Sequence, residues 1–332
     1  MNVRSRPLAA LLLLLMASLA ACSDSSRDED DAAQDEAYAA AMETEHAADT
    51  AEPSGMAEMA AAVELGAIEP VATLSEEVEY GLVNGQPVTG YLSYPADAHG
   101  GLPGIIVFHE WWGLNDNVRD MSDRLAAQGY VVLAVDLFDD RVADTPVAAG
   151  AMMKEVLAAE AEVNDNIRQA YRFITEEIGA LSVASLGWCL GGTMSMNAAL
   201  QFPEQLAGAV IYYGFVTGVT PSQLASLDMP LLGFFGAEDQ GVPVEGVRQL
   251  RDTLANLGKN AEIVIYDGAG HAFANPTGQN FQPEAAADAW ERTLVFLDRN
   301  LNAAVNRNII EESPESAAPE EDEAQPAADP AG

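Results

Sequence analysis

Basic residues are scarce in this chain of 332 residues, which has 15 lysines and arginines against 52 aspartates and glutamates. The formal net charge is −37. Nucleic acids and anionic membrane surfaces repel so acidic a chain, and we therefore expect no binding to nucleic acid. The only lysines are Lys154 and Lys259. An acidic, lysine-poor surface is favoured where high salt screens the repulsion between its charges.

Cysteine is scarce too, because the chain has only Cys22 and Cys189. Two thiols could form one disulfide. Each of these cysteines lies in a separate motif, described below, so we predict that they do not pair with one another.

The N-terminal segment, residues 1–22, has no apolar run of comfortable membrane-spanning length, because its run covers residues 8–19 only. Two arginines precede the run and small residues follow it, which is typical of a secretory signal peptide. Its last four residues, Leu-Ala-Ala-Cys22, resemble the lipobox of bacterial lipoproteins. This resemblance implies a lipidated Cys22 and an exported protein anchored on the periplasmic or cell-surface side, and Ser23 favours the outer membrane. An ordinary signal peptide or a merely hydrophobic N-terminus is the alternative.

Two further segments, residues 23–67 and 305–332, are rich in alanine, aspartate and glutamate and have few large apolar residues. Such segments bury too little apolar surface to offset the entropy lost on ordering. We predict a flexible acidic tether for the first, part of which could form an alanine-rich helix, and a disordered acidic tail for the second. Solvated filler is preferred over partner binding for both.

The folded domain is predicted at residues 68–304, where short apolar runs alternate with amphipathic segments. Two antiparallel strands are expected around Asn84-Gly85, a pair typical of tight hairpins. Further strands are predicted at 104–108, 130–135, 182–186, 207–213, 230–235 and 262–266, and helices at 117–128, 162–178, 191–202, 244–257 and 283–301. This alternation predicts an α/β fold, a mostly parallel sheet with helices on both faces. Ligands of such sheets bind at the carboxyl ends of the strands.

A nucleophile motif follows the predicted strand 182–186, in the order Gly187-Trp-Cys189-Leu-Gly-Gly. A strand, a tight glycine-rich turn and a helix are the setting of a nucleophile elbow, here with cysteine in the place of serine. The positive end of the helix favours a thiolate, and the amide of Leu190 is a candidate donor to a developing oxyanion. The alternative is a small buried cysteine that packs between glycines.

Two more strand ends supply the partners that a nucleophile needs. Asp239 follows the predicted strand 230–235, and His271 follows the predicted strand 262–266. An aspartate in a turn or a loop histidine is by itself weak evidence. The order nucleophile, acid, histidine, each after its own strand, is that of the α/β-hydrolases. We therefore predict a triad of Cys189, Asp239 and His271.

The loop after the predicted strand 104–108 reads His109-Glu-Trp-Trp-Gly-Leu-Asn. In an α/β-hydrolase this loop supplies the second oxyanion donor, and the amide of Trp111 is the candidate. Trp112 is a candidate contact for the substrate, and packing over the sheet edge is the alternative for both tryptophans. Glu110 could exchange a proton with Cys189, or it could be a salt-bridged loop carboxylate.

Together these motifs resemble those of the dienelactone hydrolase family over about residues 74–300. The resemblance implies an α/β-hydrolase fold, with Cys189 as nucleophile, His271 as base, Asp239 as its orienting acid and Glu110 as the group that holds the thiol at rest. It implies that a lactone is opened through a thioester, and that neither a metal nor another cofactor is needed.

The chain departs from this family in the residues that hold a substrate carboxylate. Family enzymes carry an arginine four residues after the histidine, where this chain has Asn275. A second arginine is displaced by one residue to Arg141, which is either an anion anchor or a surface charge. Asn275 favours esters without a carboxylate, and an export signal is unusual for an intracellular degradation step.

Three functions follow from the sequence. The leading hypothesis is a cysteine-dependent hydrolase of a small lactone or ester, favoured as a monomer, with contact to a membrane only through its lipid anchor. The second is a general carboxylesterase or thioesterase that uses the same site. The third is an inactive hydrolase fold that acts as a binding protein, which the complete triad disfavours.

Overall fold

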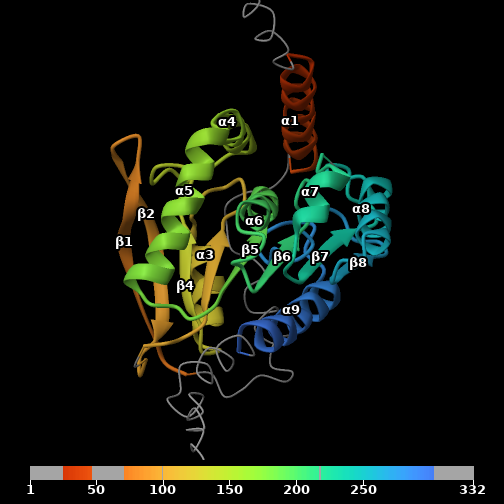
Figure 1. Ribbon diagram of the computed structural model, residues 1–332. Helices are drawn as coiled ribbons and strands as arrows, with labels where there is room; N and C mark the ends of the chain where they lie inside the picture. Colours follow the sequence, from red (N-terminus) through yellow and green to blue (C-terminus); the bar gives the residue numbers. More distant parts are fainter. Residues whose placement is uncertain (1–24, 47–70, 99, 217, 303–332) are drawn as a thin grey trace, which may run out of the picture.

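The structure, a computed structural model, describes residues 25–46, 71–98, 100–216 and 218–302. The predicted signal peptide with Cys22, residues 23–24 and 47–67 of the predicted tether and the predicted tail lie outside these residues. The core is an eight-stranded sheet in the order β1-β2-β4-β3-β5-β6-β7-β8 (Figure 1). Its strands are β1 (Thr73–Val83), β2 (Gln86–Pro95), β3 (Gly104–Phe108), β4 (Val131–Val135), β5 (Val183–Trp188), β6 (Gly208–Tyr212), β7 (Leu231–Gly236) and β8 (Ala261–Tyr266).

The sheet is parallel from β4 through β8, and β1 and β2 are antiparallel to their neighbours. Every residue of the five central strands β3 to β7 is buried, because helices cover both faces. The predicted hairpin is confirmed, with Asn84 and Gly85 in the left-handed region at φ 50° and 76°. The α/β-hydrolase fold predicted from the sequence is therefore confirmed.

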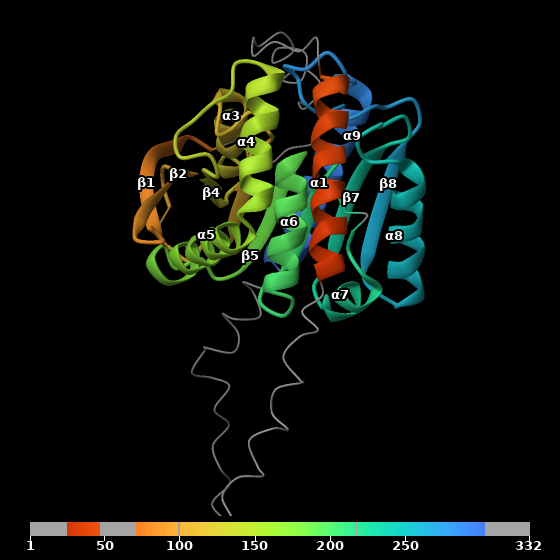
Figure 2. The same cartoon turned by 90° about the horizontal axis from the view of Figure 1, so that it is seen from above.

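Helices connect the parallel strands and form the two outer layers. They are α3 (Asp116–Ala126), α4 (Pro146–Ala158), α5 (Glu160–Arg172), α6 (Leu190–Gln201), α7 (Pro221–Ser226), α8 (Val244–Asn256) and α9 (Pro283–Leu297), with π-helical turns at Phe173–Glu177 and Asp298–Asn302. The strand order reverses direction between β3 and β5, and because such crossovers are right-handed, α3 and α6 lie on opposite faces. Figures 1 and 2 show α9 on the face of α3, and α5 and α8 on the face of α6.

Part of the predicted tether forms a helix, α1 (Ser25–Glu45), the alanine-rich helix that the sequence left open. It lies beside α4 and above α6 (Figure 1). For this segment the structure has the helix that the sequence left open rather than a flexible tether. Tyr38, Ala39 and Met42 of α1 are buried, although most of the helix is alanine and acidic residues. The folded domain supplies the apolar surface that orders them, and a local sequence pattern does not contain that surface. Among the described residues no helix combines the length and apolarity that crossing a membrane requires.

Candidate active site

The predicted elbow is present between β5 and α6, where Cys189 has φ 55° and ψ −120°. This strained conformation lifts the side chain out of the sheet edge. The neighbouring glycines are required by close backbone contacts. A Cβ on Gly187 would lie 2.1 Å from the carbonyl oxygen of Gly191, and one on Gly191 would lie 2.1 Å from that of Phe108. The motif therefore allows β3, β5 and α6 to meet directly behind the thiol.

Two predicted oxyanion donors lie at the same edge of the sheet. Leu190 is the first residue of α6, and backbone N–H groups of a first helical turn have no partner within their helix. Trp111 follows β3, the strand that pairs with β5, and its side chain is buried against Trp112 with ring centroids 5.1 Å apart. The first turn of α6 also places the positive end of its dipole at Cys189.

The predicted acid and base are in direct contact. Nδ1 of His271 lies 2.8 Å from Oδ2 of Asp239, and both side chains are fully buried. The other carboxylate oxygen, Oδ1, accepts hydrogen bonds from the amides of Gly241 at 2.9 Å and Val242 at 2.7 Å. These amides hold the carboxylate in place. Asp239 therefore orients His271, as a triad acid does.

The electrostatics of His271 couple it to Cys189. Burial alone would lower the pKa of His271, but the charges of Asp239 and Cys189, and hydrogen bonds to both residues, raise this pKa well above its ordinary value. Because Nδ1 is bonded to Asp239, the hydrogen bond between His271 and Cys189 involves the other ring nitrogen. A histidine placed in this way can accept a proton from the thiol.

Glu110 is buried beside these groups and is held by two uncharged donors. Nδ2 of Asn275 donates to Oε2 of Glu110 at 2.5 Å, and the hydroxyl of Tyr213 donates to Oε1 at 3.4 Å. Neither of these two partners carries a charge. Asn275, predicted as a contact for the substrate, instead holds Glu110, so its amide nitrogen is already engaged.

His109 positions the loop that carries Glu110. Its Nε2 accepts a hydrogen bond from the amide of Leu137 at 3.1 Å, so the ring proton is on Nδ1, which donates to the carbonyl oxygen of Glu110 at 2.6 Å. Burial lowers the pKa of His109, which keeps the ring neutral and this pattern intact. The loop after β3 is thereby tied to the loop after β4.

Arg141, for which the sequence left open an anion anchor or a surface charge, is engaged at the surface. Its side chain is 46% exposed, with Nη2 2.8 Å from Oε2 of Glu155 and Nε donating to the carbonyl oxygen of Phe138 at 2.8 Å. This geometry favours the surface-charge alternative. Trp112, predicted as a substrate contact, is 7% exposed and packs on Trp111, as the packing alternative expects.

Several residues of the site were missed from the sequence. Tyr213 has φ 37° and packs edge-on against His271, with ring centroids 5.1 Å apart. From α1, the hydroxyl of Tyr38 lies 3.6 Å from Sγ of Cys189. His46, just past α1, has its ring 5.4 Å from that of Trp111. The spacing of large residues in an otherwise alanine-rich segment is the only signal that could have found the α1 contacts.

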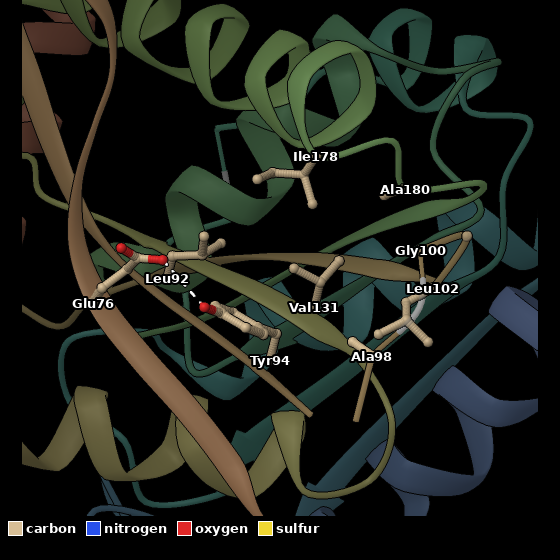
Figure 3. A pocket seen from close by; sticks show the side chains of 10 residues that line it. Glu76, Leu92, Tyr94, Ala98, Gly100, Leu102, Val131, Ile178 and Ala180 are labelled. Carbon is tan, nitrogen blue, oxygen red and sulfur yellow. Dashed lines mark hydrogen bonds between the residues drawn. The ribbon is translucent and has the colours of Figure 1, made fainter. Parts of the chain in front are cut away.

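An apolar cavity of about 270 Å³ lies at the opposite end of the sheet, where the parallel strands begin (Figure 3). Leu92, Val131 and Ile178 line it, and the hydroxyl of Tyr94 donates to Glu76 at 3.2 Å. This cavity is separate from the edge that carries the triad. Within the described ranges, no group of three or more histidine, cysteine, aspartate or glutamate side chains is placed to hold a metal ion.

Known proteins resemble this chain over the same domain. The model of the dienelactone hydrolase family matches residues 88–301. A protein of Aquifex aeolicus, provisionally named a carboxymethylenebutenolidase, is 30% identical over 66% of this chain and 96% of its own length. One of Salmonella typhimurium with the same provisional name is 30% identical over 75% of this chain and 96% of its own.

Solved structures agree with this result. A crystal structure described provisionally as a dienelactone hydrolase of Klebsiella pneumoniae has 29% identity and a TM-score of 0.61, and the match covers 68% of this chain and 98% of that one. A dienelactone hydrolase-like promiscuous phosphotriesterase from metagenomic libraries has the same fold, with 21% identity, a TM-score of 0.62 and coverage of 69% and 99%.

Proposed function

The chain belongs to the dienelactone hydrolase family, and from this premise we propose that it opens a lactone or cleaves a small ester through a thioester on Cys189. The observation that carries this proposal is the buried contact of His271 with Asp239 at 2.8 Å beside a cysteine in a nucleophile elbow. Acid, base and nucleophile in this relation are the parts of a covalent hydrolase.

The first half of the reaction forms the acyl-enzyme. His271 takes the proton of Cys189, and the thiolate attacks the carbonyl carbon of the ester. The amides of Leu190 and Trp111 stabilise the oxygen that becomes negative. The carbon–oxygen bond of the ester then breaks, and His271 gives its proton to the leaving alkoxide. In a lactone this alkoxide stays attached to the acyl group, so the ring opens.

The second half releases the acid. His271 takes a proton from water, the resulting hydroxide attacks the thioester carbonyl, and the bond to sulfur breaks. The thiolate of Cys189 then recovers its proton from His271. Glu110 is held by Asn275 and Tyr213. Burial raises the pKa of Tyr213 most, and the charges of Glu110 and Cys189 raise it further, so both groups act on the same hydroxyl. We assign Glu110 the role of disfavouring a free thiolate until substrate arrives.

The test compares the full-length protein with its Cys189→Ala variant on dienelactone and on p-nitrophenyl acetate. We expect wild type to cleave at least one of them and Cys189→Ala to lose at least about a thousandfold in kcat. Equal rates for the two proteins would rule out the cysteine mechanism. If both proteins are inactive on both compounds, the binding-protein alternative is favoured instead.

A general carboxylesterase is the second candidate function, and Asn275 favours it. A carboxylate-bearing lactone needs a cation close to the scissile bond, but Asn275 is uncharged and bonded to Glu110, and Arg141 is paired with Glu155. Clear preference for p-nitrophenyl acetate over dienelactone supports this candidate. Preference for dienelactone contradicts it.

We further propose that the protein is exported and carried on a membrane by a lipid on Cys22, as the lipobox-like sequence suggests. Metabolic labelling of cells that express the chain with radioactive palmitate tests this proposal. Label in the wild-type protein and none in Cys22→Ala is expected. Equal label in both, or none in either, contradicts it.

A further inference from the structure

One face of α1 lies on the proposed active site. Tyr38, Met42 and His46 are buried and follow one another at intervals of four residues, so they share one side of the segment. The hydroxyl of Tyr38 lies 3.6 Å from Sγ of Cys189, and the ring of His46 lies 5.5 Å from the ring of His271. A single helical segment therefore reaches both the nucleophile and the base.

The surface of the domain leaves space for this helix at two glycines. A Cβ on Gly241, in the loop of the triad acid, would lie 1.8 Å from the terminal methyl of Met42. A Cβ on Gly150 of α4 would lie 2.3 Å from the carboxylate of Glu43. At the rim, Nζ of Lys154 is 3.5 Å from Oε1 of Glu43. Two glycines thus leave the space that α1 fills, and an ion pair lies at its edge.

The ring of Tyr38 lies beside Sγ of Cys189, where the reacting part of a substrate must bind. Its ring stacks on Phe215, with centroids 4.9 Å apart and an angle of 27° between the planes. Burial, and then the charge of Cys189, raise the pKa of Tyr38 well above its ordinary value, so the hydroxyl stays protonated. Its oxygen lies within hydrogen-bond distance of the sulfur, and either atom can be the donor. The place at the nucleophile is therefore filled by an uncharged ring with one oxygen directed at Sγ.

The carboxylates of Asp239 and Glu110 outnumber the one cationic side chain at this place, His271. Asp239 and Glu110 act on the Tyr38 hydroxyl in the same direction as Cys189. A substrate carboxylate in the position of the Tyr38 ring would meet the same repulsion, whereas an uncharged lactone or aryl ester would not. A flat ring would gain the stacking contact with Phe215 that Tyr38 now makes.

The same contacts close the site. Cys189 is 1% exposed and His271 is fully buried with α1 in place, so α1 must move before a substrate reaches the sulfur. Residues 88–301, which match the family, do not include α1. The closing segment is thus an addition of this chain to the family domain.

We propose that the active site selects a flat, uncharged ring stacked on Phe215, and that Tyr38 of α1 occupies the place of that ring as an intramolecular competitor. This inference rests on the hydrolase function proposed above, since it names the substrate class of the same site. Substrate and α1 exclude one another, so the apparent affinity for substrate is reduced by the fraction of closed enzyme.

The first experiment measures how fast iodoacetamide alkylates Cys189 in the full-length protein, followed by mass spectrometry of the peptide that contains it. Tyr38→Ala is compared with Glu36→Gln, a change on the exposed side of the same helix. We expect alkylation at least about tenfold faster in Tyr38→Ala and unchanged in Glu36→Gln. Equal rates in wild type and Tyr38→Ala overturn the proposal.

If circular dichroism shows that Tyr38→Ala does not fold, Lys154→Glu provides the test instead. This change replaces the attraction to Glu43 at the rim by repulsion and leaves the site untouched. We expect alkylation about threefold faster, and more so at low salt. No acceleration at low salt would then overturn the closing role of α1.

The second experiment adds free ring compounds to the Tyr38→Ala variant. p-Cresol, the side chain of tyrosine as a free molecule, should slow the alkylation of Cys189. The control compounds are methylcyclohexanol, of similar size but not flat, and p-hydroxybenzoate, flat but charged, and both should protect less. Equal protection by methylcyclohexanol, or better protection by p-hydroxybenzoate, contradicts the substrate class. Alkylation does not require hydrolysis, so a failure of the proposed function leaves this result readable.

Discussion

Asn275 donates a hydrogen bond to the carboxylate of Glu110 over 2.5 Å, and this contact ties the histidine loop to the loop after β3. Both side chains are buried, so Asn275→Ala removes a donor from a buried acid. We expect the free energy of unfolding to fall by about 1–3 kcal/mol, measured by urea denaturation, and kcat/KM to fall as well. Asn302→Ala removes an exposed hydrogen bond to Asp298 and should cost less than about 0.5 kcal/mol. Equal losses in the two variants would contradict a structural role for the Asn275 contact.

Arg141→Ala tests whether this arginine recognises a substrate carboxylate. Because Arg141 is half exposed and paired with Glu155, we expect KM for dienelactone to stay unchanged and stability to fall by less than about 1 kcal/mol. Steady-state kinetics with dienelactone and p-nitrophenyl acetate give the measurement. A rise in KM confined to dienelactone would restore Arg141 as an anchor.

Gly191→Ala should damage the elbow far more than an ordinary glycine substitution. Its Cβ would lie 2.1 Å from the carbonyl oxygen of Phe108, a backbone atom that cannot move aside without distorting the sheet. We expect a loss of more than about 4 kcal/mol or a failure to fold. Gly129→Ala, at φ 97° with open space around it, should cost about 1–2 kcal/mol from its backbone conformation alone. Comparable thermal unfolding of the two variants would refute the close-contact argument.

The raised pKa of His271 predicts how stability depends on pH. A histidine whose pKa is higher in the folded than in the unfolded chain stabilises the fold fully below its ordinary value of 6.5, and this contribution is lost as pH rises through the raised pKa. Asp239→Asn removes the main charge that raises it. We expect the stability gap between wild type and Asp239→Asn to be about 3–5 kcal/mol at pH 6 and to narrow above pH 7, measured by denaturant titration. A gap that does not change with pH would show that His271 is not held in its charged form.

Much of the catalytic edge was predictable because its constraints are local. The run Gly104–Phe108 is buried along its whole length and was predicted with its observed bounds. The elbow at Cys189 was predictable because close backbone contacts require glycine at fixed distances from Cys189. The order of Cys189, Asp239 and His271 along the chain, each after its own strand, then predicted which strand ends meet.

What was missed depends on contacts between distant segments. Asn275 and Glu110 are 165 positions apart, and neither residue type indicates that the other is its partner. The helix Pro146–Ala158 has no clear amphipathic stripe, because α1 covers a side that would otherwise face solvent. The helix α1 itself looks like an acidic linker until the surface that receives Tyr38 and Met42 is known.

The central claim is that Cys189 carries the acyl group, and a rapid-quench experiment with p-nitrophenyl acetate tests it most directly. We predict a burst of nitrophenol of about one equivalent per enzyme, or less if deacylation is fast, together with an acetyl group on the peptide that contains Cys189. The acetyl group should be absent in Cys189→Ala and should persist longer in His271→Gln. Steady hydrolysis of the ester with no acetyl group on Cys189 at any quench time, or full activity of Cys189→Ala, would contradict the account.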